Sequence, residues 1–184
     1  MKIVRELELE GVLELSLFRH HDERGTFVKL WHLPSLSQYG ISFEVQESFW
    51  SVSGKGDIRG MHFQVPPHES KKIVCCQQGK VHDVLLDLRD GSETFGKSVS
   101  LELSENEANA VYIPEGVAHG FQGLESKNQL LYFTSHVYFP ESDLGVLWNS
   151  FEHCWPLSAE SISARDQKHP MFVDYNSPFF LKHK

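Results

Sequence analysis

The chain has 184 residues, of which 40% are hydrophobic, and a formal net charge of −8 at pH 7. This length suits one sizeable hydrophobic core, so we expect a single domain over residues 1–184. The acidic balance argues against nucleic acid or an anionic membrane as the main partner, because either would require a basic face. No apolar stretch is long enough to span a bilayer, and an odd count of three cysteines suits a reducing compartment, so we expect a cytoplasmic protein.

The chain reads as a series of short strands with few helices. Aromatic residues, which favour strands, are abundant, with 13 Phe, 5 Tyr and 4 Trp. A short helix is expected over residues 33–39. Strands are expected over residues 81–89, 99–103 and 110–113, because each is apolar or alternates apolar with polar residues and stops near a turn signal.

The C-terminal third contains fewer clear signals. A second short helix is expected over residues 141–147, and the polar, proline-containing segment from about residue 156 onward is expected to wrap around the domain. Strands at short intervals, without long helices between them, favour an antiparallel sandwich or barrel over alternating strands and helices. We therefore predict an all-β fold.

Five residues stand out because each lies in a short motif and carries useful chemistry: Arg59, His62, Lys72, His119 and Tyr132. A sheet closed into a barrel could bring these cations, imidazoles and phenol into one cavity, which would suit proton transfer on an anionic, carbonyl-bearing substrate. Taken singly, each residue could have a purely structural role, as a hydrogen-bonded core histidine, a buried tyrosine or a solvated surface charge. The order and spacing of the motifs argue against five separate structural roles and for one shared site.

The run Pro114-x-Gly116-x-x-His119 matches the second half-motif of cupins, which are small jelly-roll barrels. The first cupin half-motif normally supplies His-x-His and a later Glu, which bind a metal together with the His of the second half-motif. Here the corresponding residues are His62-Phe63-Gln64, and an amide is a poor ligand for zinc or iron. We therefore expect no metal; His68-Glu69, in what reads as a loop, is a weaker alternative ligand pair.

Further motifs occur in a fixed order from about residue 18 to residue 166, which is nearly the whole chain. They include Arg59-Gly60-x-His62-Phe63-Gln64, Lys72-Ile73-Val74, Gly79-x-Val81-x-Asp83-Val84, Ile113-Pro114-x-Gly116-x-Ala118-His119-Gly120-Phe121, Tyr132 and Tyr138. Together they resemble the dTDP-4-dehydrorhamnose 3,5-epimerase family of nucleotide-sugar epimerases. The resemblance implies a cupin-like double-stranded β-helix (jelly-roll) barrel with a few short helices, a homodimer with exchanged strands, and no metal or organic cofactor. It also implies a nucleoside-diphosphate 4-keto-6-deoxy sugar as the substrate.

The resemblance assigns four catalytic roles. His62 would be the general base that removes a proton from a carbon next to the ketone, and Asp166 would orient its imidazole. Lys72 would stabilise the enolate that forms. Tyr132 would return the proton on the opposite face of the sugar ring.

The resemblance also assigns five binding residues: Arg59, Arg24 and His119 around the sugar and diphosphate, and Tyr138 and Gln46 at the nucleotide. Two departures from the family pattern fall among the nucleotide positions. Lys29 stands where the family usually has Glu, and Ser48 stands where it usually has Asn. The segment between the tryptophans at 148 and 155 is also shorter than usual, which shifts Asp166 by three places within an intact Ser-x-x-Asp context.

Several alternatives stay open from the sequence. The enzyme could invert only one of the two carbons, could use a CDP-, GDP- or UDP-linked sugar, or could be a 3,4-ketoisomerase. A sugar-binding or metal-binding cupin without activity is the alternative from another class of protein. The joint presence of His62, Lys72 and Tyr132 argues against it, because a binding module needs no base and acid on separate strands.

Overall fold

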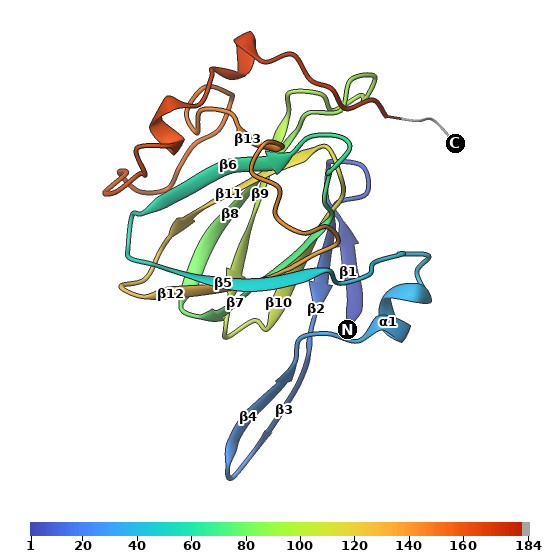
Figure 1. The fold of residues 1–184 in the computed structure, drawn as a ribbon. Coiled ribbons are helices and arrows are strands. Elements are labelled where there is room, and N and C mark those ends of the chain that lie inside the picture. Colours follow the sequence, from blue (N-terminus) through green and yellow to red (C-terminus); the bar gives the residue numbers. More distant parts are fainter. Residues whose placement is uncertain (182–184) are drawn as a thin grey trace.

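The computed structural model describes residues 1–181, and two antiparallel sheets face each other across a shared core (Figure 1). The first sheet has six strands in the spatial order β1 (Lys2–Glu6), β2 (Leu13–Ser16), β10 (Asn109–Ile113), β7 (Lys72–Gln78), β12 (Asn128–Thr134) and β5 (Glu47–Ser53). The second has five, in the order β13 (Asp143–Gly145), β6 (Ile58–Gln64), β11 (Val117–Gly123), β8 (Lys80–Asp87) and β9 (Ser98–Ser104). The predicted all-β class is confirmed.

Alternation along the strands builds the core between the sheets. In β12 every second residue is buried, so that Leu130 and Tyr132 face inward while their neighbours are partly exposed. This period of two is the geometry of a strand with one buried face. Side chains from the other sheet, including Leu85 and Phe121, belong to the same buried cluster. Both sheets therefore contribute to one apolar interior, and residues on their inner faces can meet.

The three strand predictions are confirmed by β8, β9 and β10, and the helix expected at 33–39 is present as α1 (Leu33–Ser37). The helix expected over residues 141–147 is wrong. Residues 143–145 form β13 instead, which pairs antiparallel with β6 through Asp143 opposite Gln64 and Gly145 opposite His62. A free sheet edge supplied backbone partners that local sequence preference could not reveal.

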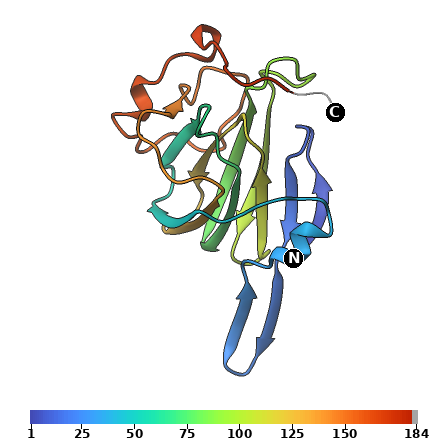
Figure 2. The same ribbon diagram turned by 45° about the vertical axis from the view of Figure 1, so that its right-hand side comes forward.

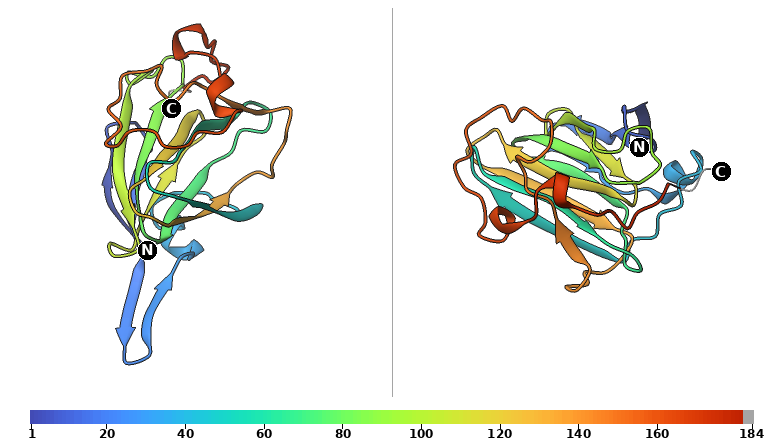
Figure 3. Two further views of the ribbon diagram at one scale, coloured as in Figure 1. Left: turned by 90° about the vertical axis from the view of Figure 1, so that its left-hand side faces the viewer. Right: turned by 90° about the horizontal axis from the view of Figure 1, so that it is seen from above.

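Two segments extend beyond the sheets. The hairpin of β3 (Phe18–Asp22) and β4 (Gly25–Lys29) projects away from the rest of the chain in Figures 1 and 2 and in the left view of Figure 3. The C-terminal segment carries two short 3₁₀ helices, η1 (Asp166–Lys168) and η2 (Phe172–Asp174), and lies beside the five-stranded sheet (Figure 3). The N–H of Ile58 donates a hydrogen bond to Ser161 O at 2.9 Å, which fixes this segment against β6. In the described part of the chain, no helix is long and apolar enough to cross a membrane.

Candidate active site

A cavity of about 290 Å³ opens between the two sheets. This is at the low end of the roughly 300–1,000 Å³ that is usual for small-molecule sites. Six of the nine side chains predicted from the sequence line it: Arg59, His62, Lys72, His119, Tyr132 and Tyr138. His62 comes from β6 in the five-stranded sheet and Tyr132 from β12 in the six-stranded sheet, so the two lie on opposite walls.

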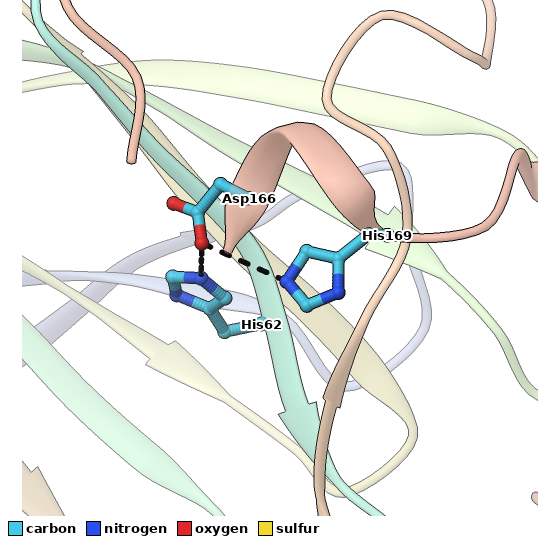
Figure 4. A group of neighbouring side chains, drawn as sticks. All are labelled: His62, Asp166 and His169. Carbon is cyan, nitrogen blue, oxygen red and sulfur yellow. Dashed lines mark hydrogen bonds and ion pairs between the residues drawn. The ribbon is translucent and has the colours of Figure 1, made fainter. Parts of the chain in front are cut away.

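His62 is held by a carboxylate from the C-terminal segment (Figure 4). Its Nε2 lies 2.8 Å from Oδ1 of Asp166, which is only 3% exposed, and the N–H of Gly60 donates to the other oxygen, Oδ2, at 3.1 Å. Because a carboxylate accepts and does not donate, Nε2 of the neutral ring carries the proton. The lone pair then resides on Nδ1, which has no hydrogen-bond partner within residues 1–181 and is free to act as the base.

The ionisation of this pair suits a base. Burial lowers the pKa of His62 below its ordinary value, Asp166 opposes this by favouring the charged ring, and the cation of Lys72 adds to the lowering. Burial alone would raise the pKa of Asp166, but the imidazoles of His169 and His62 and the N–H of Gly60 outweigh it and hold that pKa well below its usual range. At neutral pH the pair is therefore a neutral imidazole on a carboxylate.

Lys72 stands at the first position of β7, with its Nζ 3.3 Å from the backbone oxygen of His62. Burial lowers the pKa of Lys72 to about 8, while the carboxylates of Asp143 and Asp83 oppose the shift. The ammonium form still dominates at pH 7. A cation in this place can stabilise negative charge that develops on a bound carbonyl oxygen.

Tyr132 presents a protonated phenol from the opposite wall. Its ring stacks on Phe49, with ring centroids 4.7 Å apart and an interplanar angle of 14°, and its hydroxyl lies 3.5 Å from Ser51 Oγ. Burial raises the pKa of Tyr132 far above its ordinary value, although the hydrogen bond with Ser51 opposes this. The phenol thus keeps its proton until a stronger base on the substrate takes it.

His119 and Arg59 are fixed by groups of the barrel. His119 Nε2 lies 2.8 Å from Oδ2 of Asp83, a fully buried carboxylate on β8. The Arg59 guanidinium donates from Nε to Ser53 Oγ at 2.8 Å and from Nη2 to the Val52 carbonyl at 3.0 Å. Each side chain is therefore oriented before any ligand binds, which lowers the ordering cost of binding.

The structure does not bring Gln46 and Arg24 to this cavity. Gln46 precedes β5 and is exposed, whereas Glu47, Phe49 and Ser51 of the same strand line the cavity. Arg24 lies at the tip of the projecting hairpin, where its guanidinium binds Asp22 with Nη2 2.6 Å from Oδ2. Their assigned roles stay predictions.

Sequence reasoning missed several residues of the site. Asp83 lies inside the motif Gly79-x-Val81-x-Asp83-Val84, and its alternation with Val81 and Leu85 along an apolar strand was the available signal that it shares their buried face. Glu47, Asp143 and Arg165 also line the cavity, and Arg165 Nη2 pairs with Asp143 Oδ2 at 2.7 Å. Nothing in the local sequence indicated these three, since their placement depends on how distant segments pack.

The residues at the cupin ligand positions do not fit a cupin metal. His62 and His119 are each bonded to a carboxylate of their own, Asp166 and Asp83. The Gln64 side chain is used by the loops, since Nε2 donates to the His68 carbonyl at 2.8 Å and Oε1 accepts from the Phe139 N–H at 2.7 Å. The position that supplies the second imidazole of the cupin ligand set therefore carries an amide that is already bonded to the loops, and that half-motif provides no further ligand beside His62.

The fold and the site define a cupin-type acid–base enzyme, with a carboxylate-bound imidazole opposite a phenol and a cation beside them. A sequence model of the family described as dTDP-4-dehydrorhamnose 3,5-epimerase matches residues 6–174. The chain belongs to the dTDP-4-dehydrorhamnose 3,5-epimerase family, and it is an isomerase of the epimerase class.

Individual relatives agree with this placement. The dTDP-4-dehydrorhamnose 3,5-epimerase of Mycobacterium tuberculosis is 35% identical over 96% of this chain and 91% of its own length. A dTDP-4-dehydrorhamnose 3-epimerase of Streptomyces niveus is also 35% identical, over 89% of this chain and 81% of the relative. The crystal structure of dTDP-6-deoxy-D-glucose-3,5-epimerase from Legionella pneumophila, in complex with dTDP-4-keto-L-rhamnose, has a TM-score of 0.91 at 27% identity, covering 96% of this chain and 97% of that one.

Proposed function

We propose that the enzyme epimerises a dTDP-linked 4-keto-6-deoxy sugar at the two carbons that flank the ketone. The observation that carries the proposal is the placement of His62 and Tyr132 on opposite walls of one cavity. Inversion at carbon requires that a proton leave from one face of the ring and return to the other. A base and an acid fixed to different sheets provide that arrangement.

In the proposed mechanism, Nδ1 of His62 removes the proton next to the ketone while Nε2–H stays bonded to Asp166. The electron pair of the broken C–H bond moves into the enolate, and Lys72 stabilises the charge on its oxygen. The Tyr132 hydroxyl then donates its proton to the same carbon from the other face. Exchange with solvent returns a proton to Tyr132 and removes one from His62, so both groups are restored.

Solvent deuterium incorporation tests this mechanism. In heavy water, the product of the wild-type enzyme should carry deuterium at both flanking ring positions, detected by mass spectrometry and proton NMR. Label at one position would assign a single epimerisation, the activity named for the S. niveus relative. A product whose ketone has moved would instead indicate a ketoisomerase, and epimerised product without deuterium would refute the mechanism.

We also propose thymidine as the nucleotide, which is supported by the dTDP-sugar in the similar L. pneumophila structure. Lys29 and Ser48 depart from the family pattern at nucleotide positions, so the base needs a direct test. A thermal-shift panel with dTDP, UDP, CDP and GDP should give the largest rise in Tm with dTDP. Selective stabilisation by another nucleotide would overturn this part of the proposal.

A homodimer is proposed because the hairpin of β3 and β4 carries Arg24 away from the cavity of its own chain (Figure 1). The hairpin also exposes Phe18 and Phe27, at 52% and 57%, as expected of a surface that packs against another copy. We infer that Arg24 acts in the site of the partner subunit.

Subunit mixing tests this inference. His62→Asn and Arg24→Ala homodimers should both be impaired, but after mixing and exchange a heterodimer holds one site with native His62 and native Arg24. Activity should therefore rise above that of either parent, towards half of the wild-type value per heterodimer. No recovery in verified heterodimers would place Arg24 in its own chain's site or remove its role.

We also propose that the protein is cytoplasmic and that residues 1–184 form a single folding unit. Cys75 and Cys76 are buried free thiols and Cys154 is exposed and free, as suits a reducing compartment. Cell fractionation tests the first point, and a single cooperative calorimetric transition tests the second.

A further inference from the structure

Asp166 has a second imidazole beside it. His169 Nε2 lies 3.6 Å from the same oxygen, Oδ1, that accepts the hydrogen bond of His62, and the two rings are 5.8 Å apart and nearly perpendicular (Figure 4). Asp166 opens η1 and His169 follows the helix as its C-cap, so the two residues are one 3₁₀ turn apart. The spacing Asp-x-x-His in this short turn is what aims both side chains at one point.

His169 occupies a closely fitted place. Its side chain is 11% exposed, and a Cβ on Gly145 would lie 2.5 Å from His169 Nε2. Gly145 has no positive φ, so the absence of a side chain there serves space rather than backbone conformation. Gly145 is also the β13 residue opposite His62 in the strand register. A Cβ there would also lie 2.6 Å from the Met61 backbone oxygen, so the glycine makes room both for the neighbouring strand and for an imidazole directly beside the base.

The Nε2 atom of His169 is buried and has no hydrogen-bond partner among the described residues. Such orphaned polar atoms are uncommon and call for a specific explanation. The nearest acceptor is Asp166 Oδ1, and a carboxylate oxygen has two lone pairs, of which His62 uses one. A small movement of the ring would complete a second hydrogen bond to the same oxygen.

We propose that His169 is a positioning residue of the base: its Nε2–H is a second donor to Asp166 Oδ1, and it limits how strongly Asp166 holds the proton of His62. This inference rests on the proposed function, in which His62 takes and releases a proton in every turnover. A carboxylate shared between two donors binds each one less strongly, so His62 returns more readily to its neutral, basic form. Without the second donor, Asp166 would favour the imidazolium of His62 more strongly.

Other charged groups also face His62 and Asp166. They are Lys72 from β7, Arg165 from the turn before η1, Asp143 from β13, which pairs with Arg165, and His119 from β11, which is bonded to Asp83. All of them are present in every variant used below. A change in the titration of His62 between variants therefore reports on position 169.

The test compares His169→Leu, which fills the space without a donor, with His169→Gln, whose amide nitrogen can stand where Nε2 stands. Two readouts are used: the acid limb of the kcat/KM profile against pH, and the ring NMR titration of His62 in substrate-free enzyme labelled at histidine. His169→Leu should move both upward by about half to one pH unit, the equivalent of one hydrogen bond. His169→Gln should restore values close to those of the wild type, and near-ultraviolet circular dichroism verifies the fold of each variant.

Three results would overturn the proposal. The first is no shift in folded His169→Leu, and the second is an equal shift in His169→Gln, which would reduce His169 to a packing role. The third is stoichiometric transition metal in the purified wild type, because ligand atoms of His62, Asp166 and His169 lie within 4.8 Å of one another. Failure of the proposed function would look different, since the wild type would then not epimerise the sugar while the His62 titration could still be measured.

Discussion

Replacement of Asp166 by Asn tests the link between the C-terminal segment and the base. The carboxylate accepts from His62 Nε2 at 2.8 Å through Oδ1 and from the Gly60 N–H at 3.1 Å through Oδ2. An amide has only one acceptor oxygen for these two donors. If that oxygen faces Gly60, the amide N–H₂ faces His62 and forces the ring proton onto Nδ1, which removes the lone pair that attacks the substrate.

The charge contributes separately. Once His62 has taken a proton, its bond to Asp166 is a hydrogen bond between charged groups, which typically contributes about 1.5–3 kcal/mol. At about 1.4 kcal/mol per factor of ten, its loss slows proton removal roughly 10- to 150-fold, and the tautomer change adds to this. We therefore expect kcat to fall by at least about 10²-fold, with deuterium exchange at the substrate reduced equally.

The pH dependence has a predicted sign. Asp166 raises the pKa of His62 against the larger lowering by burial, so removal of the carboxylate should move the acid limb of kcat/KM to lower pH. Asp174→Asn, the same change at an exposed carboxylate in η2, is the matched control and should behave like the wild type. A folded Asp166→Asn enzyme that loses less than about threefold in kcat, or whose acid limb moves upward, would refute this reasoning.

Three further predictions concern other parts of the chain. His62→Asn should abolish solvent exchange, whereas Tyr132→Phe should reduce epimerisation more than exchange; equal losses in both assays for Tyr132→Phe would count against its role as the acid. Lys72→Met should lower kcat by about 10²- to 10³-fold. The wild type should lose activity near pH 8 as Lys72, with its pKa of about 8, loses its proton, and the variant should lack this basic limb of the pH–rate profile. A basic limb retained in the variant would assign that limb to another group. Asp87→Asn should lower the free energy of unfolding, measured in urea, by about 3–5 kcal/mol. The buried Arg89 guanidinium donates to Asp87 from Nε and Nη2 at 2.8 and 2.9 Å and would lose its counter-charge. A decrease in the free energy of unfolding below about 1 kcal/mol would contradict this.

The sequence predicted best those residues whose positions follow from strand alternation. His62, Lys72 and Tyr132 lie in or at the start of strands, and two buried inner faces bring them together once the sheets pack. The same local signals predicted β8, β9 and β10. Strand alternation depends only on residues that are close together in the chain, and a sequence pattern reports such local relations directly.

The features that could not be predicted depend on distant packing. Asp166 is 104 residues from His62 and reaches it from an irregular segment, so only family resemblance suggested the pair. Residues 143–145 form a strand because β6 offers a free edge. The place of His169 could not be predicted, because it lies outside any strand and approaches the base only through the folded C-terminal segment. Arg24 belongs to a hairpin that projects away from its own chain, so only the proposed homodimer would bring it to an active site.

The separation of His62 and Tyr132 onto different sheets makes their spacing a property of the whole hydrophobic interior. Leu130, fully buried and on the same inner face of β12 as Tyr132, helps to set how closely the sheets approach. Evolution could therefore widen or narrow the reaction gap by exchanging aliphatic residues that never touch a ligand. A change in which sugars such an enzyme accepts could then arise from substitutions in the hydrophobic core, while the polar catalytic residues stay the same.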